Sequence, residues 1–326
     1  MTPRVAVTSR LPGRAVEWLE ERCRVTLNTG TQITDEDGLI AFIAAADGAL
    51  TLLANPVTDR VLAACPDLRV VGNCAVGFDN IDLEAARRRG VWVTNTPDVL
   101  TEATADLTWA LILAVTRRLG EAERLLRGGG FRGWALDMLL GSSIQGRQLG
   151  VVGYGRIGRA VARRAAGFGM SVAYSAREEL ADPDPPATFM PLEELLSTSH
   201  VVSLHTPFSE ANRHLIDGQR LRLMPRGAFL INTARGPLID EAALVAVLQE
   251  GRLGGAGLDV FEHEPSIHPG LVERDDVVLL PHIGSATVET RAVMAELAAK
   301  NILAVLTGEE PPTPVVRPTD HGRQSS

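Results

Sequence analysis

The stretch Gln148 to Arg159 reads QLGVVGYGRIGR, and it decides the fold expected for the second half of the chain. An apolar, strand-like run leads directly into a glycine-rich turn, which is followed by the helical pattern RAVARRAAGFG. A Gly-x-Gly-x-x-Gly motif is weak alone, but between a strand and a helix it predicts a dinucleotide-binding turn. Gly153 permits the tight turn, Gly155 lets the backbone approach a pyrophosphate, and Gly158 lets the helix lie close to the strand. The alternative is an ordinary glycine-rich turn.

Strand-like and helical segments alternate on both sides of this turn. After it, strands are expected at SVAY, HVVSLHT, GAFLINT, GAGLDV and DVVLLP, which together with QLGVV predict a six-stranded doubly wound sheet. Before it, the alternation that begins at RVAVTS and ends near Asn95 predicts a smaller parallel sheet covered by helices. A long helical segment, Thr101 to Leu119, is expected to connect the two. The predicted fold class is therefore α/β, with two doubly wound parallel-sheet domains.

The C-terminal region divides into two parts. Residues Val288 to Leu306 carry a helical pattern, and we expect this helix to fold back on the first domain. The following PPTPVVRPTDHGRQSS is rich in proline and polar residues, so it is expected to form a loose tail.

The composition excludes several classes of function. The chain has 326 residues, of which 45% are hydrophobic and 22% charged, and its net charge is −8. Because there is no dense basic run, we expect a small-molecule partner, and neither nucleic acid nor a membrane. Lys300 is the only lysine, which disfavours Schiff-base chemistry and a phosphate loop of the GK[ST] type. Charges interrupt the N-terminal apolar residues, and no apolar run approaches the ~20 residues of a membrane span, so a cytoplasmic location is expected.

The residues YSAR, Tyr174 to Arg177, bear on the choice of cofactor. In NAD-specific sites an Asp or Glu about 20 residues after the glycines binds the ribose 2′-hydroxyl. Here Ala176 takes that place, and Arg177 follows it. A guanidinium binds a phosphate through parallel hydrogen bonds and no carboxylate repels it, so the site is expected to favour NADP, with Ser175 as a further donor and NAD as a second cofactor. The alternative is that Arg177 merely pairs with a neighbouring glutamate on the surface.

Three residues that suit the reduction of a 2-keto acid follow predicted strands. Arg235 ends INTARG, the FEHEP segment supplies Glu264 or Glu262, and His282 follows VVLLP. Open α/β sheets place ligands at the carboxyl ends of their strands, so these side chains are expected to meet there. The Arg would bind carboxylate and carbonyl oxygens, the His would donate a proton, and the Glu would keep the His charged.

The spacing of histidines and cysteines predicts no metal site. A site built from His263, His268 and His282 is the alternative, but these residues match no helical metal-binding motif. The three cysteines are odd in number and lack a CxxC pattern, so we expect reduced thiols.

Taken together, these motifs resemble those of the D-isomer-specific 2-hydroxyacid dehydrogenase family, over nearly all of the chain except its end. Besides GYGRIG, the matching stretches are NCAVGFDNIDL, LHTPFSEANRHLI, MPRGAFLINTARGPLIDEAAL, GAGLDVFEHEP and LLPHIGSAT, in family order. Within the family, the glyoxylate/hydroxypyruvate reductases are the most similar. The resemblance implies a flavodoxin-like substrate-binding domain made of residues 1–98 and 286–326, and a Rossmann dinucleotide-binding domain made of residues 99–285.

The resemblance also implies roles for individual residues. Arg235, Glu264 and His282 would be the catalytic set, and Glu264 is preferred to Glu262 because it precedes Pro265. The implied substrate contacts are Arg235, Ser285 and the backbone amides of Val76 and Gly77. The implied cofactor contacts are Thr104, Gly153, Gly155, Arg156, Ile157, Gly158, Ser175, Arg177, Thr206, Pro207, Thr233 and Asp259, of which Asp259 would hold the nicotinamide amide.

These features predict an NADPH-dependent reductase that converts glyoxylate and hydroxypyruvate to glycolate and D-glycerate. Ala176 departs from the acidic residue of NAD-dependent members, whereas Arg177 resembles the NADP-dependent ones. Val76 stands where the similar phosphite dehydrogenases carry a lysine, and 326 residues leave no room for the regulatory domain of many phosphoglycerate dehydrogenases. The alternatives are a dehydrogenase for another 2-keto acid and an interaction protein that senses NAD(P).

A homodimer formed through the nucleotide domain is expected from the resemblance. The apolar segment GWALDMLLG, residues 133–141, is expected to contribute to its interface. The alternative for this segment is a place in the local core.

Overall fold

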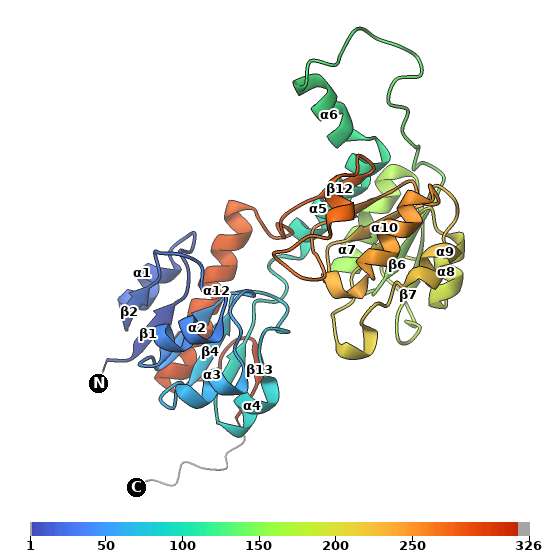
Figure 1. Cartoon of the computed structure of the whole chain (residues 1–326). Helices are drawn as coiled ribbons and strands as arrows, with labels where there is room; N and C mark the ends of the chain where they lie inside the picture. The colour runs from blue at the N-terminus through green and yellow to red at the C-terminus, as the bar shows by residue number, and fades with distance from the viewer. Residues whose placement is uncertain (1, 319–326) are drawn as a thin grey trace. The chain divides into compact units, whose positions relative to one another are not determined.

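The structure of the protein, a computed structural model, describes residues 2–318 (Figure 1). The chain divides into two compact units, Met1–Leu100 with Ser285–Ser326, and Thr101–Gly284. Each unit is an α/β domain built on a parallel or largely parallel sheet, so the predicted fold class is confirmed. No helix within residues 2–318 is both long and apolar enough to cross a membrane.

The first unit contains a six-stranded sheet in the order β13-β5-β4-β3-β1-β2. Its strands are β1 (Arg4–Val7), β2 (Arg24–Leu27), β3 (Gly48–Thr51), β4 (Val70–Asn73), β5 (Trp92–Thr94) and β13 (Pro314–Val316). All neighbouring pairs are parallel except β13 and β5, which are antiparallel. The helices of this unit are α1 (Ala15–Glu20), α2 (Glu36–Ile43), α3 (Asp59–Ala64), α4 (Leu83–Arg88) and α12 (Val288–Thr307).

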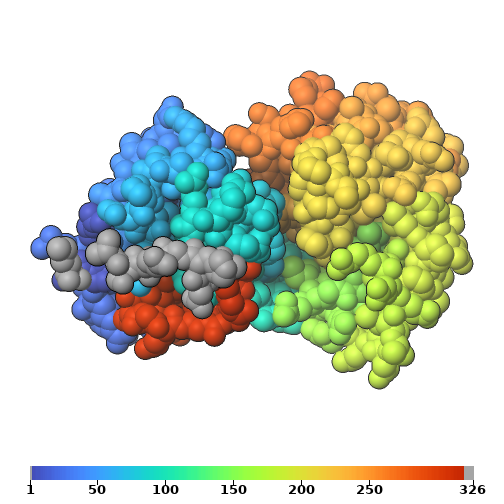
Figure 2. All heavy atoms as spheres, turned by 90° about the horizontal axis from the view of Figure 1, so that it is seen from below, coloured from blue at the N-terminus to red at the C-terminus, as the bar shows by residue number. Residues whose placement is uncertain are grey.

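Helices cover both faces of this sheet. On one face α1 and α12 bury Leu19 and Ile302 against strand residues such as Val5, and α2, α3 and α4 pack on the other face. A Cβ added at Gly72 in β4 would lie 2.8 Å from a side-chain carbon of Ile302, so this glycine lets α12 lie close to the sheet. The C-terminal helix therefore folds back on the first domain as predicted, and Figure 2 shows the red C-terminal segment beside the blue and teal atoms of the chain's first hundred residues.

The predicted loose tail is wrong for residues 314–316, which form β13. Asn301 of α12 holds this segment, because its buried side chain accepts the Thr313 backbone N–H at 3.0 Å and donates to Thr313 Oγ1 at 2.8 Å. Val316 is buried beside β5, and an edge strand tolerates Pro314. Composition alone could not indicate this anchoring by a distant helix. The end of the predicted tail, residues 319–326, lies outside the described residues.

The second unit contains a seven-stranded parallel sheet in the order β12-β11-β10-β9-β6-β7-β8. Its strands are β6 (Gln148–Val152), β7 (Ser171–Ser175), β8 (Thr188–Phe189), β9 (Val201–Leu204), β10 (Phe229–Asn232), β11 (Gly255–Leu258) and β12 (Val277–Leu279). The predicted count of six strands is therefore one too low. The additional strand, β8, has only two residues and offers no alternating pattern to detect.

Helices cover both faces of this second sheet as well. On one face lie α5 (Thr101–Thr116) and α7 (Arg156–Ala165), which bury residues such as Trp109 and Val161. On the other face lie α8 (Leu192–Thr198), α9 (Gly218–Leu223), α10 (Glu241–Gln249) and α11 (Pro269–Val272). The carboxyl ends of the strands, between these two helix layers, are where the ligand-binding loops of such a sheet begin.

A helix and a loop project away from the sheet of the second unit (Figure 1). The helix predicted for Thr101 to Leu119 is confirmed as α5, which ends at Thr116. Arg118, in a left-handed conformation with φ 52°, separates it from a further helix, α6 (Leu119–Arg127). The residues of α6 are all at least partly exposed, and Trp134 and Leu136 in the following loop are 79% and 81% exposed. The GWALDMLLG segment is therefore not part of the local core. We call α6 together with residues 128–141 the arm.

Candidate active site

The glycine turn between β6 and α7 brings the strand, the helix and the loop after β9 into close contact. Gly153 has φ +92°, and a Cβ added there would lie 2.7 Å from the backbone of His205. A Cβ added at Gly158 would lie 2.2 Å from the Gly153 carbonyl oxygen, so only glycine lets α7 start this close to the turn. Around Gly155, by contrast, nothing in the described chain beyond its immediate chain neighbours lies within 4 Å of an added Cβ. This open space at the N-terminus of α7 suits the pyrophosphate of a dinucleotide.

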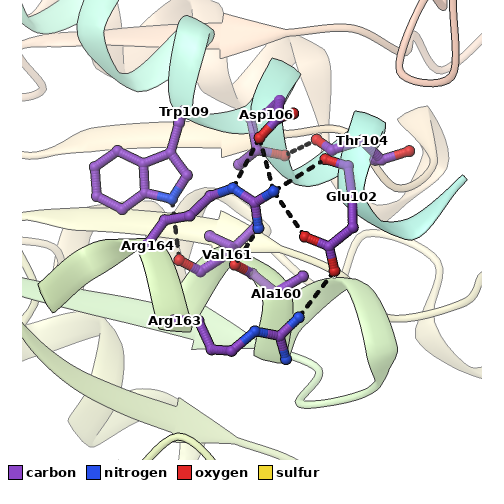
Figure 3. Close-up of polar contacts among 9 residues, drawn as sticks. Glu102, Thr104, Asp106, Trp109, Ala160, Val161, Arg163 and Arg164 are labelled. Atoms are coloured by element: carbon purple, nitrogen blue, oxygen red, sulfur yellow. Dashed lines mark hydrogen bonds and ion pairs between the residues drawn. The ribbon is translucent and has the colours of Figure 1, made fainter. Parts of the chain in front are cut away.

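A network of ion pairs fixes α7 to the first turns of α5 (Figure 3). Arg164 binds Glu102 at 2.8 Å and Asp106 at 2.7 Å, and Arg163 binds Glu102 at 2.9 Å. The hydrogen bond from Arg164 is the largest cause that lowers the pKa of Glu102. A network of several charges holds its geometry better than an isolated exposed pair. This network therefore fixes the position of α7, which follows the glycine turn, relative to Thr104 of α5.

Asp259 lies just beyond β11, buried at the carboxyl edge of the sheet. Its Oδ1 accepts the Ile283 backbone N–H at 2.7 Å, whereas Oδ2 has no hydrogen-bond partner within residues 2–318. Burial raises the pKa of Asp259, and the Ile283 amide offsets part of that effect. A buried acceptor without a partner is costly, and an amide donor on a ligand would satisfy it. The residues present thus fit a nicotinamide carboxamide at this position.

Two of the predicted threonine contacts lie at the same edge. A Cβ added at Gly284 would lie 3.2 Å from Asp259 Oδ2 and 3.5 Å from Thr104 Cγ2, so all three residues meet. Thr233, directly after β10, shares a 2.9 Å hydrogen bond between hydroxyl groups with Thr108 of α5. The structure therefore gathers Thr104, Thr233 and Asp259 from three separate elements.

The strand β9 leads to Thr206 and Pro207 through His205, which the sequence analysis did not single out. The His205 backbone lies against Gly153, and its Nε2 shares a 2.8 Å hydrogen bond with Ser203. Burial lowers the pKa of His205 to about 3, so its imidazole is neutral at physiological pH. His205 therefore supports the glycine turn and is not the proton donor.

The YSAR segment spans the end of β7 and the start of a loop. Ser175 ends the strand, and its carbonyl oxygen accepts the Gly153 N–H at 2.8 Å. Arg177 is exposed and makes no ion pair or hydrogen bond with any residue of the described chain. The alternative of a surface pair with a neighbouring glutamate is therefore absent from the structure. Arg156 and Ile157 open α7 on the other side of the glycine turn.

Arg235, Glu264 and His282 each follow a strand of the second unit. Asn232 ends β10, and its Nδ2 donates to the Arg235 carbonyl oxygen at 2.8 Å, which fixes the turn after the strand. Glu264 Oε1 accepts the Phe261 N–H at 3.1 Å, while Glu264 Oε2 lies 2.9 Å from His282 Nδ1. The structure thus brings Glu264 and His282 into direct hydrogen-bond contact.

The electrostatics of this pair favour an ionised Glu264. Burial alone would raise its pKa, but the hydrogen bonds from His282 and from the Phe261 backbone, together with the positive charge of Arg235, outweigh burial and leave the pKa lowered. The side chains of His282 and Glu264 are 33% and 37% exposed, so a small ligand can reach them. Because the carboxylate holds Nδ1 of the imidazole, Nε2 is the atom that can face a substrate.

The turns after β10 and β11 are fastened to each other by residues that the sequence analysis missed. A Cβ added at Gly236 would lie 1.9 Å from the carbonyl group of Phe261, so the two backbones touch. Glu241, buried in the first turn of α10, accepts the Glu262 N–H at 2.8 Å. These contacts depend on which loops meet in three dimensions, and no spacing in the sequence indicates them.

His214 adds a third link between these turns. Its Nε2 lies 2.6 Å from a carboxylate oxygen of Glu262, and its backbone N–H donates to the Pro237 carbonyl oxygen at 2.8 Å. It thus holds Glu262, the glutamate not chosen as catalytic, in a structural role. We call residues 232–241 and 259–265, together with His214, the corner.

The remaining predicted substrate contacts lie in the first unit. The carbonyl oxygens of Val76 and Gly77 accept the side-chain amides of Asn95 at 2.8 Å and Asn73 at 2.9 Å. Their own N–H groups have no acceptor among residues 2–318. Ser285 is the first residue of the C-terminal part of this unit. The loop after β4 therefore presents two backbone donors of the kind that bind a carboxylate.

Two of the histidines considered for a metal site, His268 and His282, have other roles. His268 Nδ1 accepts the Gly270 N–H at 3.1 Å and caps α11, while His282 binds Glu264. Across the described residues, no group of three or more His, Cys, Asp or Glu side chains could hold a metal ion.

Comparisons with known proteins agree with this geometry. Residues 109–284 match the family model described as D-isomer specific 2-hydroxyacid dehydrogenase, NAD binding domain. A glyoxylate reductase of Thermococcus onnurineus is 45% identical over 323 residues, which cover 97% of this chain and 97% of that protein.

Solved structures give the same likeness. A protein of Thermus thermophilus superimposes with a TM-score of 0.91 at 47% identity, covering 96% of this chain and 100% of that one. The NADPH-dependent glyoxylate/hydroxypyruvate reductase of Sinorhizobium meliloti, in complex with NADP and malonate, gives a TM-score of 0.86 at 35% identity, covering 97% of each chain.

Proposed function

Because the chain belongs to the D-isomer-specific 2-hydroxyacid dehydrogenase family and is an NAD(P)-dependent oxidoreductase, we propose that it reduces glyoxylate and hydroxypyruvate to glycolate and D-glycerate with NADPH. The observation that carries the proposal is the 2.9 Å hydrogen bond between His282 Nδ1 and Glu264 Oε2. Hydride addition to a carbonyl carbon leaves an alkoxide that must gain a proton, and a charged imidazole supplies one.

In this mechanism His282 is the proton donor. Glu264 holds Nδ1 of the imidazole, so that Nε2 donates to the forming alkoxide. Arg235 binds the substrate carboxylate and polarises the carbonyl oxygen, for which its planar guanidinium is suited. The nicotinamide, when bound, supplies the hydride. Arg235 and His282 therefore both stabilise the negative charge that develops on the carbonyl oxygen as it is reduced.

We also propose that the backbone amides of Val76 and Gly77 bind the substrate. Their carbonyl oxygens are already bound by Asn95 and Asn73, which fixes the loop with its N–H groups unpaired within residues 2–318. Two such donors would bind the carboxylate of a 2-keto acid, and Ser285 would lie near it.

The preference for NADPH is supported by the YSAR segment. Ala176 supplies no carboxylate to repel a 2′-phosphate, and Arg177 has no ionic partner in the described chain. A guanidinium and the Ser175 hydroxyl could bind such a phosphate together. The reductase of Sinorhizobium meliloti, which is similar over nearly its whole length, was solved with NADP.

We further propose that the protein is a homodimer that buries the arm. Trp134 and Leu136 expose most of their apolar surface to solvent, which is unfavourable in a monomer. Aromatic residues are enriched in protein–protein interfaces. The double substitution Trp134→Ser with Leu136→Ser should shift the sedimentation coefficient from dimer to monomer. Leu223→Ser, at an exposed leucine of α9, is the matched control and should leave the dimer intact. A wild-type monomer would contradict this part of the proposal.

Substitution of His282 tests the proposed chemistry. In His282→Ala, kcat for both keto acids should fall by roughly 100- to 10,000-fold at neutral pH, because general acid catalysis contributes about that factor. Binding of the nicotinamide cofactor, measured by fluorescence titration, should persist. His200→Ala is the control, since His200 precedes β9 at the opposite edge of the sheet. Near-wild-type turnover in His282→Ala would refute the assigned role.

A further inference from the structure

The loop between β7 and β8, residues 176–187, has little structure of its own. It contains no helix or strand, and most of its residues are exposed. Within the described chain, only two hydrogen bonds join it to the rest of the protein. The Tyr154 hydroxyl donates to the Pro185 carbonyl oxygen at 2.7 Å, and the Leu180 N–H donates to the Tyr174 hydroxyl at 2.9 Å. Two tyrosine hydroxyls therefore make all of its hydrogen bonds to the rest of the described chain, and Ala176, Leu180 and Ala187 add packing against the apolar core.

These residues are the only two tyrosines of the chain. Tyr154 is the second residue of the glycine turn and Tyr174 lies in β7, yet their rings stack with centroids 4.4 Å apart at an interplanar angle of 30°. Phe189 of β8 meets Tyr174 edge-on at 5.5 Å. Both tyrosines are buried, at 4% and 0% exposure, so packing fixes where each hydroxyl points.

The Tyr154 hydroxyl keeps its proton at any physiological pH. Burial raises the pKa of Tyr154 to about 12, so the group remains a hydrogen-bond donor. The phenol thus joins the glycine turn, where a pyrophosphate would bind, to the far end of the loop at Pro185. Tyr174 fixes the near end at Leu180, three residues after Arg177.

We propose that Tyr154 and Tyr174 are positioning residues that hold this loop so that Arg177 meets the 2′-phosphate of NADPH. The inference rests on the NADPH preference proposed above. An arginine on an unfastened loop would lose both loop and side-chain entropy on binding a phosphate, and a loop already held avoids part of that cost. The two hydroxyls should therefore improve binding of NADPH but not of NADH, which lacks the phosphate.

The test uses Tyr154→Phe and Tyr174→Phe, which keep the stacked rings and remove only the hydroxyls. Dissociation constants for NADPH and NADH are measured by nicotinamide fluorescence, and displacement by adenosine 2′,5′-bisphosphate is compared with displacement by adenosine 5′-monophosphate. Each variant should weaken NADPH and the bisphosphate by roughly two- to tenfold, the effect of one hydrogen bond, and leave NADH and the monophosphate unchanged. The double variant should approach the selectivity of Arg177→Ala.

Controls separate this role from a general structural one. Ser197→Ala, which removes an exposed hydroxyl from α8, should alter neither affinity. If both phenylalanine variants weaken NADPH and NADH equally, or leave their ratio unchanged while Arg177→Ala lowers it, the positioning role is overturned and the cofactor proposal stands. If the wild type binds both cofactors equally and Arg177→Ala changes nothing, the NADPH preference itself fails, and the inference with it.

Discussion

The corner and the loop between β7 and β8 lie at the carboxyl ends of strands in one sheet, but they are held in opposite ways. In the corner, Asn232, Glu241 and His214 fasten two turns whose backbones touch at Gly236. The loop has only two hydrogen bonds to the rest of the described chain, both to tyrosine hydroxyls, and a few apolar contacts with the core. The corner carries the proposed proton chemistry, and the loop carries the proposed recognition of a phosphate.

This difference matches what each task demands. Proton donation requires reacting groups held within about 0.5 Å of a productive geometry, whereas a charge that selects a phosphate tolerates more freedom. A change in the corner should therefore affect turnover and stability together. A change in the loop should affect only the choice of cofactor.

The largest effect is expected from Gly236→Ala. The added Cβ would lie 1.9 Å from the Phe261 carbonyl group, so the two turns must move apart. A displacement of about 1 Å should lower kcat by roughly 100-fold. The free energy of unfolding, from urea titration, should fall by about 1–3 kcal/mol, the cost of overpacking.

The ratio of kcat/KM for NADPH and NADH should stay constant in this variant, because the loop is untouched. Gly167→Ala is the matched control, since a Cβ added there would meet nothing in the described chain beyond the neighbouring backbone within 4 Å. A Gly236→Ala enzyme with wild-type turnover would mean that the corner is not the rigid region inferred here.

A smaller and more selective effect is expected from Arg177→Ala. Loss of the guanidinium should lower the NADPH preference by about tenfold, or 1.4 kcal/mol, through KM and not through kcat. Steady-state kinetics with both cofactors measures it. Arg222→Ala removes another exposed arginine of the same unit and should change nothing. A fall in kcat with both cofactors would contradict the separation of the two regions.

The smallest effect concerns the pH dependence of stability. Folding lowers the pKa of Glu264. Its carboxylate therefore stabilises the folded state at pH values above the ordinary glutamate pKa of about 4.3. This stabilisation is lost as the pH falls through the lowered pKa of the folded state. The Tm difference between wild type and Glu264→Gln should be largest above about pH 5 and shrink below about pH 4. We expect at most about 1 kcal/mol, because solvent screens these partly exposed groups. A difference independent of pH would contradict the assigned charge.

The sequence predicted those parts of the molecule that follow from local pattern. The Gly-x-Gly-x-x-Gly turn was recognisable because a strand precedes it and a helix follows it. The meeting of Glu264 and His282 was predictable because both follow strands of one parallel sheet. In each case a short-range pattern and one topological rule were sufficient.

The remaining features depend on contacts between distant segments. The strand β13 forms because Asn301 of a far helix binds Thr313, although the tail composition predicts disorder. Glu241 and His214 fasten the corner only because loops distant in sequence meet there. The tyrosine pair is similar, since nothing in GYGRIG indicates that its Tyr154 would reach Pro185.

The most direct test of the central proposal is the product formed from hydroxypyruvate and NADPH by the wild-type protein. Consumption of NADPH is followed at the nicotinamide absorbance, and the product is separated on a chiral column. We predict one D-glycerate for each NADPH consumed. L-Glycerate as the product, or no NADPH consumption with either hydroxypyruvate or glyoxylate, would contradict the account.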